Sequence, residues 1–165
     1  MTDMHHILIS VGSNVDREVH TRAGVAAVQA IFDDVQLSSV YESEAVGFNG
    51  AAFYNLVISA RTALPIQEVC LQLKQIERDN GRQRGEKKFA PRTLDLDLLT
   101  YDNEVTSTPI VLPREEIVYN AFVLQPLAEL VPDDIHPVAQ QSYRQLWQDY
   151  DKRQQKLWPI EFDWR

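Results

Sequence analysis

Two aspartates separated by one residue form the pair of side chains with the clearest chemical potential in this sequence. Asp95 and Asp97 lie in the apolar run Leu94–Leu99, shortly after Arg92. Alternate side chains of a β-strand point to opposite faces, so the two carboxylates share one face, roughly 6–7 Å apart. Their repulsion is about 2–3 kcal/mol at an effective dielectric near 20. A cation offsets it, and Mg²⁺ prefers such oxygen ligands; a structural ion pair with Arg92 is the alternative.

Basic residues gather just before this strand, although the chain as a whole is acidic. The sequence holds 24 Asp and Glu against 16 Lys and Arg, for a net charge of −8. Seven of the sixteen basic residues lie between residues 74 and 92. An acidic chain is a poor candidate for following a nucleic-acid backbone, whereas a local positive cluster favours a small anionic ligand. A solvated run of surface charge is the alternative.

Length and composition indicate one globular domain, residues 1–165. Hydrophobic residues make up 44% and charged residues 24% of the sequence, which is typical of a folded, non-membrane protein. The apolar runs are too short to span a bilayer, and the single cysteine, Cys70, fits a reducing compartment. We therefore expect a cytoplasmic protein without membrane or nucleic-acid partners. Because no long apolar stripe is left unassigned, we expect a monomer.

The hydrophobic pattern predicts alternating strands and helices in the first hundred residues. Strands are expected at residues 6–11, 35–41, 53–60 and 93–101. One helix is expected from a cap at Asp16 to about Phe32, and a second from Pro65 to a stop at Asn80–Gly81. The resulting order, βαββαβ, is the split βαβ pattern of ferredoxin-like folds. We expect an α+β fold with an antiparallel sheet and both helices packed on one face.

The remaining residues are expected to form a C-terminal strand and helix elaboration of that core. Residues 109–113 are predicted to add a short strand, and the apolar stretch 121–130 to extend the core. A helix is predicted over residues 141–150, and the aromatic tail 157–165 is expected to cap an apolar surface.

Five sequence motifs together resemble a known family. The sequence is similar to 6-hydroxymethyl-7,8-dihydropterin pyrophosphokinase from about Ile7 to Pro137. The run Pro91–Asp97 and the basic loop before it are the most specific part of the match. The matching motifs are Gly12-Ser13-Asn14, Phe53-Tyr54-Asn55, Arg82-x-Arg84, Pro91–Asp97 and Phe122–Leu127.

The resemblance implies an ATP-dependent reaction that feeds folate biosynthesis. In that reaction the hydroxymethyl oxygen of the reduced pterin attacks the β-phosphorus of ATP, and AMP leaves. The resemblance also implies two Mg²⁺ ions, with Asp95 and Asp97 as their ligands. Holding the triphosphate in line and neutralising its charge are what such a transfer requires. Arg82 and Arg92 join the two aspartates as the implied catalytic residues.

The same resemblance implies the residues that bind each substrate. Phe53 and Phe122 match the aromatic pair that stacks on the pterin, and the amide of Asn55 suits the donors and acceptors of its ring edge. The 43–47 segment surrounds the pterin, with Ser43 and Val46 as the implied contacts. The implied ATP-binding residues are Lys74, Arg82, Arg84, Arg92, Leu98 and Arg114.

Two positions depart from the family pattern. Arg114 stands where the family usually has a histidine, and Asn120 where it usually has an arginine. We therefore expect Arg114 to supply the positive charge of the missing pair. The departures also leave open a non-catalytic regulator that binds pterin or nucleotide, or a kinase with an altered pterin acceptor. A ferredoxin-like RNA-binding module is disfavoured by the negative net charge.

Overall fold

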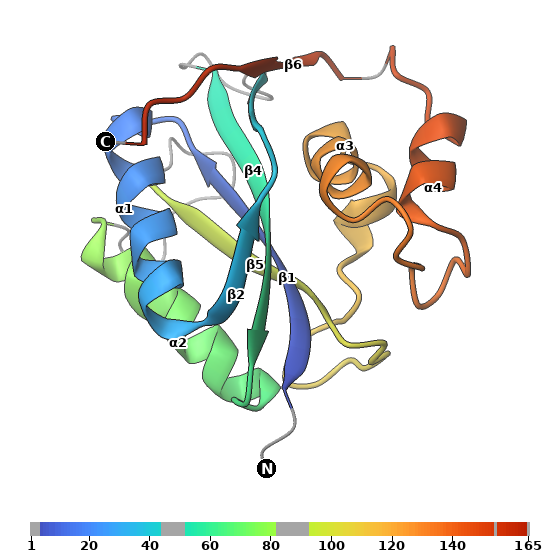
Figure 1. Ribbon diagram of the computed structural model, residues 1–165, viewed down its shortest axis with the longest axis horizontal. Helices are drawn as coiled ribbons and strands as arrows, with labels where there is room; N and C mark the ends of the chain where they lie inside the picture. The colour runs from blue at the N-terminus through green and yellow to red at the C-terminus, as the bar shows by residue number, and fades with distance from the viewer. Residues whose placement is uncertain (1–3, 44–51, 82–92, 154, 165) are drawn as a thin grey trace.

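An antiparallel sheet with helices on both sides forms the protein (Figure 1). The computed structural model describes residues 4–43, 52–81, 93–153 and 155–164. The strands are β1 His5–Ser13, β2 Asp33–Leu37, β3 Val40–Ser43, β4 Phe53–Thr62, β5 Asp95–Tyr101 and β6 Leu157–Ile160. The helices are α1 Arg17–Ile31, α2 Ile66–Asp79, α3 Ala121–Leu130 and α4 Tyr143–Asp149, with a 3₁₀ turn at Glu115–Val118. No helix in these ranges is long and apolar enough to cross a membrane.

The sheet has the order β5-β1-β4-β3-β6, and β2 pairs with β4 next to β3. Every pairing between these strands is antiparallel. Helices α1 and α2 cover one face of the sheet, and α3 lies on the other face with α4 packed against it. The predicted α+β class, the antiparallel sheet and the presence of C-terminal helices are therefore confirmed.

The sheet is buried on both faces, which gives the protein two apolar cores. One core fills the space between the sheet and α1 and α2, and includes Leu56 and Ile58 of β4. The other lies beneath α3 and α4 and includes Val57, between those two residues in sequence. Because neighbouring strand residues point to opposite faces, the uninterrupted apolar run in β4 supplies both cores.

The outer strand predicted at residues 35–41 is two strands, β2 and β3, with a break at Ser38–Ser39. At the break the Ser38 hydroxyl accepts the N–H of Val57 at 2.9 Å, in place of a backbone carbonyl. The carboxylate of Glu129 on α3 accepts the N–H of Ser39 and the hydroxyl of Tyr41. These side-chain bonds satisfy the groups that a continuous strand would pair, so the strand divides without leaving buried polar groups unbonded.

Strand β5 lies at one edge of the sheet and contains a β-bulge. Leu8 pairs with Thr100 and Ile9 with Leu98, so Leu99 is the extra residue. The carbonyl of Leu99 accepts the backbone N–H of Arg114 at 2.9 Å. The bulge therefore attaches the segment before the 3₁₀ turn to the strand that carries the two aspartates.

Several predictions about the ends and connections need correction. Asp16 precedes α1, but its φ of 44° is left-handed and its side chain makes no capping hydrogen bond. Residues 109–113 form no strand, since only an isolated bridge joins Thr106 to Leu112. Helix α4 is shorter than predicted, because the hydroxyl of Ser142 accepts the N–H of Gln145 and starts the helix there. Gly81, with a φ of 90°, does end α2 as predicted.

Candidate active site

The side chains of Asp95 and Asp97 share the α3-facing side of β5. Leu96 and Leu98, which alternate with them, are buried in the core beneath α1 and α2. The two aspartates are only partly buried, and the side chain of Asp97 is 42% exposed. The strand thus has its leucines in the core and both carboxylates at an accessible surface.

Strand pairing aligns the aspartates with the start of β4. Asp95 is paired with Gly12 of β1, and Gly12 is paired on its other side with Asn55 of β4. Asp95 and Asn55 therefore lie in one cross-strand row, with a glycine between them. A Cβ at position 12 would lie 3.1 Å from Oδ1 of Asn55 and 3.7 Å from the ring of Phe53. The glycine keeps this part of the sheet surface clear.

The residues at the start of β4 form the other end of this row. Asn55 is buried, and its amide nitrogen donates to the hydroxyl of Ser43 on β3 at 2.9 Å. Phe53 lies two residues earlier and therefore faces the same side. Phe122, in the first turn of α3, packs against the core on this side of the sheet. The structure thus brings Ser43, Phe53, Asn55 and Phe122 to one face.

Arg114 approaches the aspartates from the segment attached to the β5 bulge. Its Nη2 atom lies 3.9 Å from Oδ1 of Asp97, and its Nε atom lies 3.7 Å from Oε1 of Glu116. Burial, reinforced by the charge of Asp97, raises the pKa of Glu116, while Arg114 opposes that rise. A hollow lined by Val111, Arg114, Glu115, Glu116 and Tyr119 adjoins the guanidinium. A permanent positive charge therefore sits beside one of the two carboxylates.

Helix α2 contributes two further groups near this charge cluster. Burial raises the pKa of the Cys70 thiol, Lys74 and Arg114 lower it by their charge, and Asp97 raises it. Lys74, Arg114 and Asp97 therefore all lie close enough to Cys70 to shift the pKa of its thiol. Lys74 itself is exposed on α2, where it can reach an anionic ligand.

Glu77 is the residue that the sequence reasoning missed as part of this site. Its carboxylate accepts the backbone N–H of Leu96, the residue between the two aspartates, at 2.8 Å. Because β5 is an edge strand, its outward N–H groups need partners from outside the sheet. The signal was present in the sequence, since Glu77 follows Leu73 and Ile76 at the spacing of the buried face of α2.

Not every predicted site residue contributes a side chain to this surface. The side chain of Leu98 is buried among α1, α2 and the sheet, so only its backbone can face a ligand. Asn120 precedes α3, and its Oδ1 accepts from the amide of Gln155. The predicted contacts Val46, Arg82, Arg84 and Arg92 lie outside the residues that the structure describes.

The donor set of the described residues fits a magnesium ion that is shared with a ligand. Within those residues, no cluster of three or more His, Cys, Asp and Glu side chains could hold a metal by itself. Two carboxylates on one face are nevertheless a common protein contribution to Mg²⁺, which keeps waters and takes oxygens from substrate phosphates.

A family model matches most of the chain. Residues 8–132 match the model of the family 7,8-dihydro-6-hydroxymethylpterin-pyrophosphokinase (HPPK). The chain therefore belongs to the HPPK family.

Curated relatives agree with this assignment. The chain is 33% identical to the 2-amino-4-hydroxy-6-hydroxymethyldihydropteridine pyrophosphokinase of Aquifex aeolicus over 146 residues, covering 87% of this chain and 91% of that protein. It is 36% identical to the enzyme of the same name from Bacillus subtilis, covering 74% and 75%. It also matches a folate synthesis bifunctional protein of Chlamydia caviae at 31% identity, covering 82% of this chain and 32% of that protein.

Solved structures show the same fold at low sequence identity. The HPPK-DHPS protein of Plasmodium falciparum, in its A437G form with pteroate, superposes with a TM-score of 0.72 at 13% identity. The superposition covers 90% of this chain and 43% of that one. The chain thus spans less than half the length of that solved protein.

Proposed function

We propose that this chain transfers the diphosphoryl group of ATP to the hydroxymethyl oxygen of 6-hydroxymethyl-7,8-dihydropterin. AMP leaves, and the pterin diphosphate serves folate biosynthesis. Membership of the HPPK family supports the reaction. The observation that carries the proposal is the cross-strand row that aligns Asp95 with Asn55 across Gly12. This row places a pair of carboxylates beside a surface with aromatic and amide groups. The carboxylates suit a donor that carries phosphates, and the aromatic and amide surface suits a flat polar acceptor.

In the proposed mechanism, Asp95 and Asp97 would hold two Mg²⁺ ions. The chemistry that such ions would supply is neutralisation of the triphosphate charge. Arg114 and Lys74 add positive charge for the phosphate oxygens, together with Arg82, Arg84 and Arg92. The backbone at Leu98 is proposed to contact the nucleotide. A guanidinium suits this role because its planar fork matches two phosphate oxygens.

The acceptor is proposed to lie on the face formed by Phe53, Asn55, Ser43 and Phe122, with Val46 nearby. The two phenylalanines stack on the pterin, and each ring contributes on the order of 1 kcal/mol beyond burial. The amide of Asn55 is oriented by its bond to the Ser43 hydroxyl. That bond leaves an amide proton and the carbonyl oxygen of Asn55 for the ring edge. Orientation of this kind supplies much of the rate advantage of a bound reactant.

We further infer a ferredoxin-like core and a cytoplasmic monomer. Taking β2 and β3 as one interrupted outer strand gives the order β5-β1-β4-β2/β3, which supports the split βαβ arrangement. The cysteine Cys70 is half-buried and unpaired, in keeping with a reducing compartment. Light scattering after gel filtration tests the oligomeric state, because a dimer would double the 19.0 kDa mass.

The direct test mixes the purified chain with Mg²⁺, ATP and the hydroxymethyl dihydropterin and measures AMP. We expect AMP formation that falls on the order of 100-fold in Asp97→Asn. Asp133→Asn is the matched control, since its side chain is 79% exposed and forms an ion pair with Arg144 rather than with a residue of the proposed site. Tight binding of both ligands without AMP would instead identify the regulator that the departures at Arg114 and Asn120 leave open.

A further inference from the structure

Arg17, the first residue of α1, contacts the ends of two neighbouring strands. Its Nη2 atom lies 2.9 Å from Oε2 of Glu42 near the end of β3. Its Nη1 atom donates to the carbonyl of Ala52, directly before β4, at 2.8 Å. A guanidinium presents its donors in a rigid planar fork. One side chain therefore joins the strand that ends at Ser43 to the strand that begins at Phe53.

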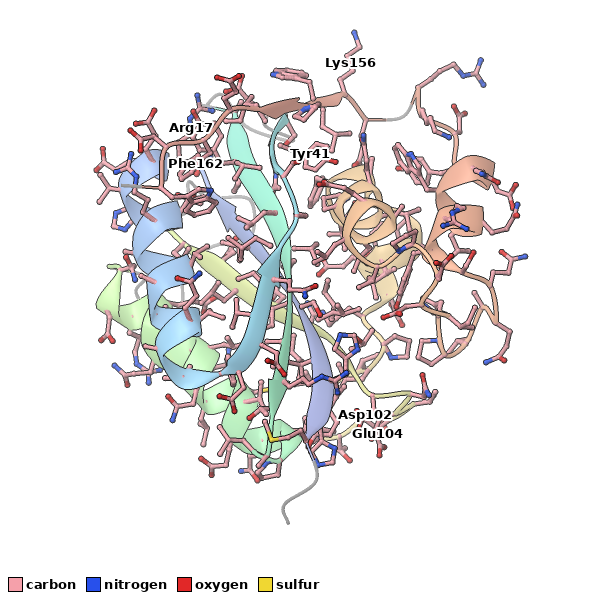
Figure 2. All side chains as sticks on the ribbon, viewed as in Figure 1. Arg17, Tyr41, Asp102, Glu104, Lys156 and Phe162 are labelled. Carbon is pink, nitrogen blue, oxygen red and sulfur yellow. The ribbon has the colours of Figure 1, made fainter. Side chains whose placement is uncertain are left out.

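The same guanidinium also lies over the ring of Tyr54, 3.9 Å from its centroid. That ring also packs nearly perpendicular to the ring of Phe162 in the C-terminal tail, with centroids 5.8 Å apart. Figure 2 shows Arg17 and Phe162 close together, where the start of α1 meets the tail. Tyr54 stands between Phe53 and Asn55 in sequence, so its ring faces α1 while their side chains face α3.

These contacts hold the strand ends from the side opposite the proposed acceptor. The side chains of Arg17 and Glu42 are 27% and 24% exposed, so solvent screens their attraction less than that of an open surface pair. Glu42 pairs directly with Tyr54 across the two strands. Losing the guanidinium removes a side-chain contact from both strand ends at once, immediately beside Ser43 and Phe53.

We propose that Arg17 is a positioning residue for acceptor binding. It braces the end of the β3–β4 ladder with side-chain contacts, at the point where Ser43 and Asn55 bond and where Phe53 begins its strand. This inference rests on the proposed function. The contacts of Arg17 given above are with β3 and with the start of β4 rather than with β5, so we expect it to act on the pterin and to leave the nucleotide unaffected.

The test compares Michaelis constants for the two substrates in Arg17→Ala, Arg17→Lys and Arg22→Ala. Arg22 is the matched control, because it lies on the same helix but directs its guanidinium to the tail, where it donates to the carbonyl of Asp163 and lies over the ring of Phe162. We expect Arg17→Ala to raise KM for the pterin about tenfold, with KM for ATP within about twofold of wild type. Arg17→Lys should recover part of the loss, since lysine keeps the ion pair but not the fork.

The outcomes separate this inference from the proposed function. A wild-type chain that forms no AMP would overturn both. An active wild type overturns the inference alone if Arg17→Ala matches Arg22→Ala, or if the two Michaelis constants rise equally. If Arg17→Ala does not fold, Arg17→Lys decides, because an unchanged KM for the pterin in that folded variant would also overturn the inference.

Discussion

Arg114 is the residue that places a guanidinium beside one of the two carboxylates, at a position where the family resemblance leads us to expect a histidine. Its guanidinium lies 3.9 Å from Asp97 and is held on its other side by the half-buried Glu116. Both contacts are long for a bidentate ion pair, which leaves its N–H groups available to phosphate oxygens. The substitution therefore keeps a positive charge beside the carboxylates.

We predict that Arg114→Ala raises KM for ATP about tenfold, because a charge-assisted hydrogen bond contributes about 1.5 kcal/mol. Steady-state AMP formation at varied ATP measures this effect. Arg114→His, which restores the usual family residue, should recover part of the affinity. Arg144→Ala is the control, since Arg144 is 55% exposed and pairs with Asp133. Unchanged ATP affinity in Arg114→Ala would refute a phosphate-binding role.

His136 shows how a single buried ring makes stability depend on pH. Its Nδ1 accepts the N–H groups of Val138 and Ala139, and burial lowers its pKa from the ordinary 6.5. As the pH falls through 6.5, His136 therefore takes up its proton in the unfolded chain before it does so in the folded chain. The free energy of unfolding rises with pH wherever the unfolded state holds more protons. The contribution of neutral His136 is therefore fully present above pH 6.5 and is lost as the pH falls toward the lowered pKa of the folded state.

We predict that His136→Asn reduces the loss of stability between about pH 7.5 and about pH 5.5, as measured by urea unfolding. The asparagine oxygen can accept the same two N–H groups but does not titrate in this range. His136→Ala, which removes the acceptor, should instead destabilise the protein at both pH values. An identical pH dependence in wild type and His136→Asn would show that the ring does not couple to folding.

At the level of elements, a side chain from α2 bonds the outward edge of β5. The carboxylate of Glu77 bonds the outward N–H of Leu96, between the two aspartates, and the glutamate is only 9% exposed. Removing it leaves the Leu96 amide without this acceptor, and the edge strand loses a polar contact with the helix while the apolar packing between them remains. The strand that carries Asp95 and Asp97 is therefore held in place by a residue that contacts neither substrate in the proposed mechanism.

We predict that Glu77→Ala destabilises the protein by about 2 kcal/mol, the range for hydrogen bonds to charged groups. Urea unfolding measures the change, and AMP formation should fall as the two carboxylates lose their alignment. Glu68→Ala on the exposed side of the same helix is the control, with an expected effect under about 0.5 kcal/mol. Equal stability of the two variants would contradict this role.

Element-level patterns explain which parts of the fold could be predicted. Alternation in the run from Leu94 to Leu99 was enough to set both aspartates on one face, because strand geometry fixes that relation locally. The break at Ser38–Ser39 could not be predicted, since it depends on Glu129 from a helix about ninety residues later. The strand β6 was missed for the same reason, because its pairing with β3 is a long-range contact.

At the scale of the whole molecule, the sequence analysis did not predict the second apolar core, which lies beneath α3 and α4. Both helices of the βαββαβ core were expected on one face, and they do lie there, but α3 and α4 cover the other face. The run Leu56-Val57-Ile58 carried the signal, because an unbroken apolar strand is typical of a sheet buried on both sides. The candidate site was predictable only where local geometry or the family motif reached it. Spacing placed Glu77 on the buried face of α2, but its bond to Leu96 and the contacts of Arg17 needed the tertiary structure.

The tail contributes to overall stability through Phe162, which packs against Tyr54 and beneath Arg22. We predict that Phe162→Ala lowers the free energy of unfolding by about 1–2 kcal/mol, less than a fully buried phenylalanine would. Trp158→Ala is a suitable comparison, since Trp158 lies on β6 but is 41% exposed. Urea unfolding of both variants measures the difference, and an equal small effect would show that the tail is not anchored by Phe162.

The pairing of Asp95 and Asn55 with the same glycine has a consequence for how new specificities can arise. Because adjacent strands are spaced about 4.8 Å apart, the main chains of these two residues are separated by about 10 Å, whatever side chains they carry. The backbone hydrogen bonds between the strands, rather than the side chains of the site, fix that main-chain separation. Mutations that remodel the β3–β4 end, proposed to bind the alcohol, therefore need not move the end proposed to hold the phosphates, so evolution or a protein engineer can change one half of the proposed site independently of the other.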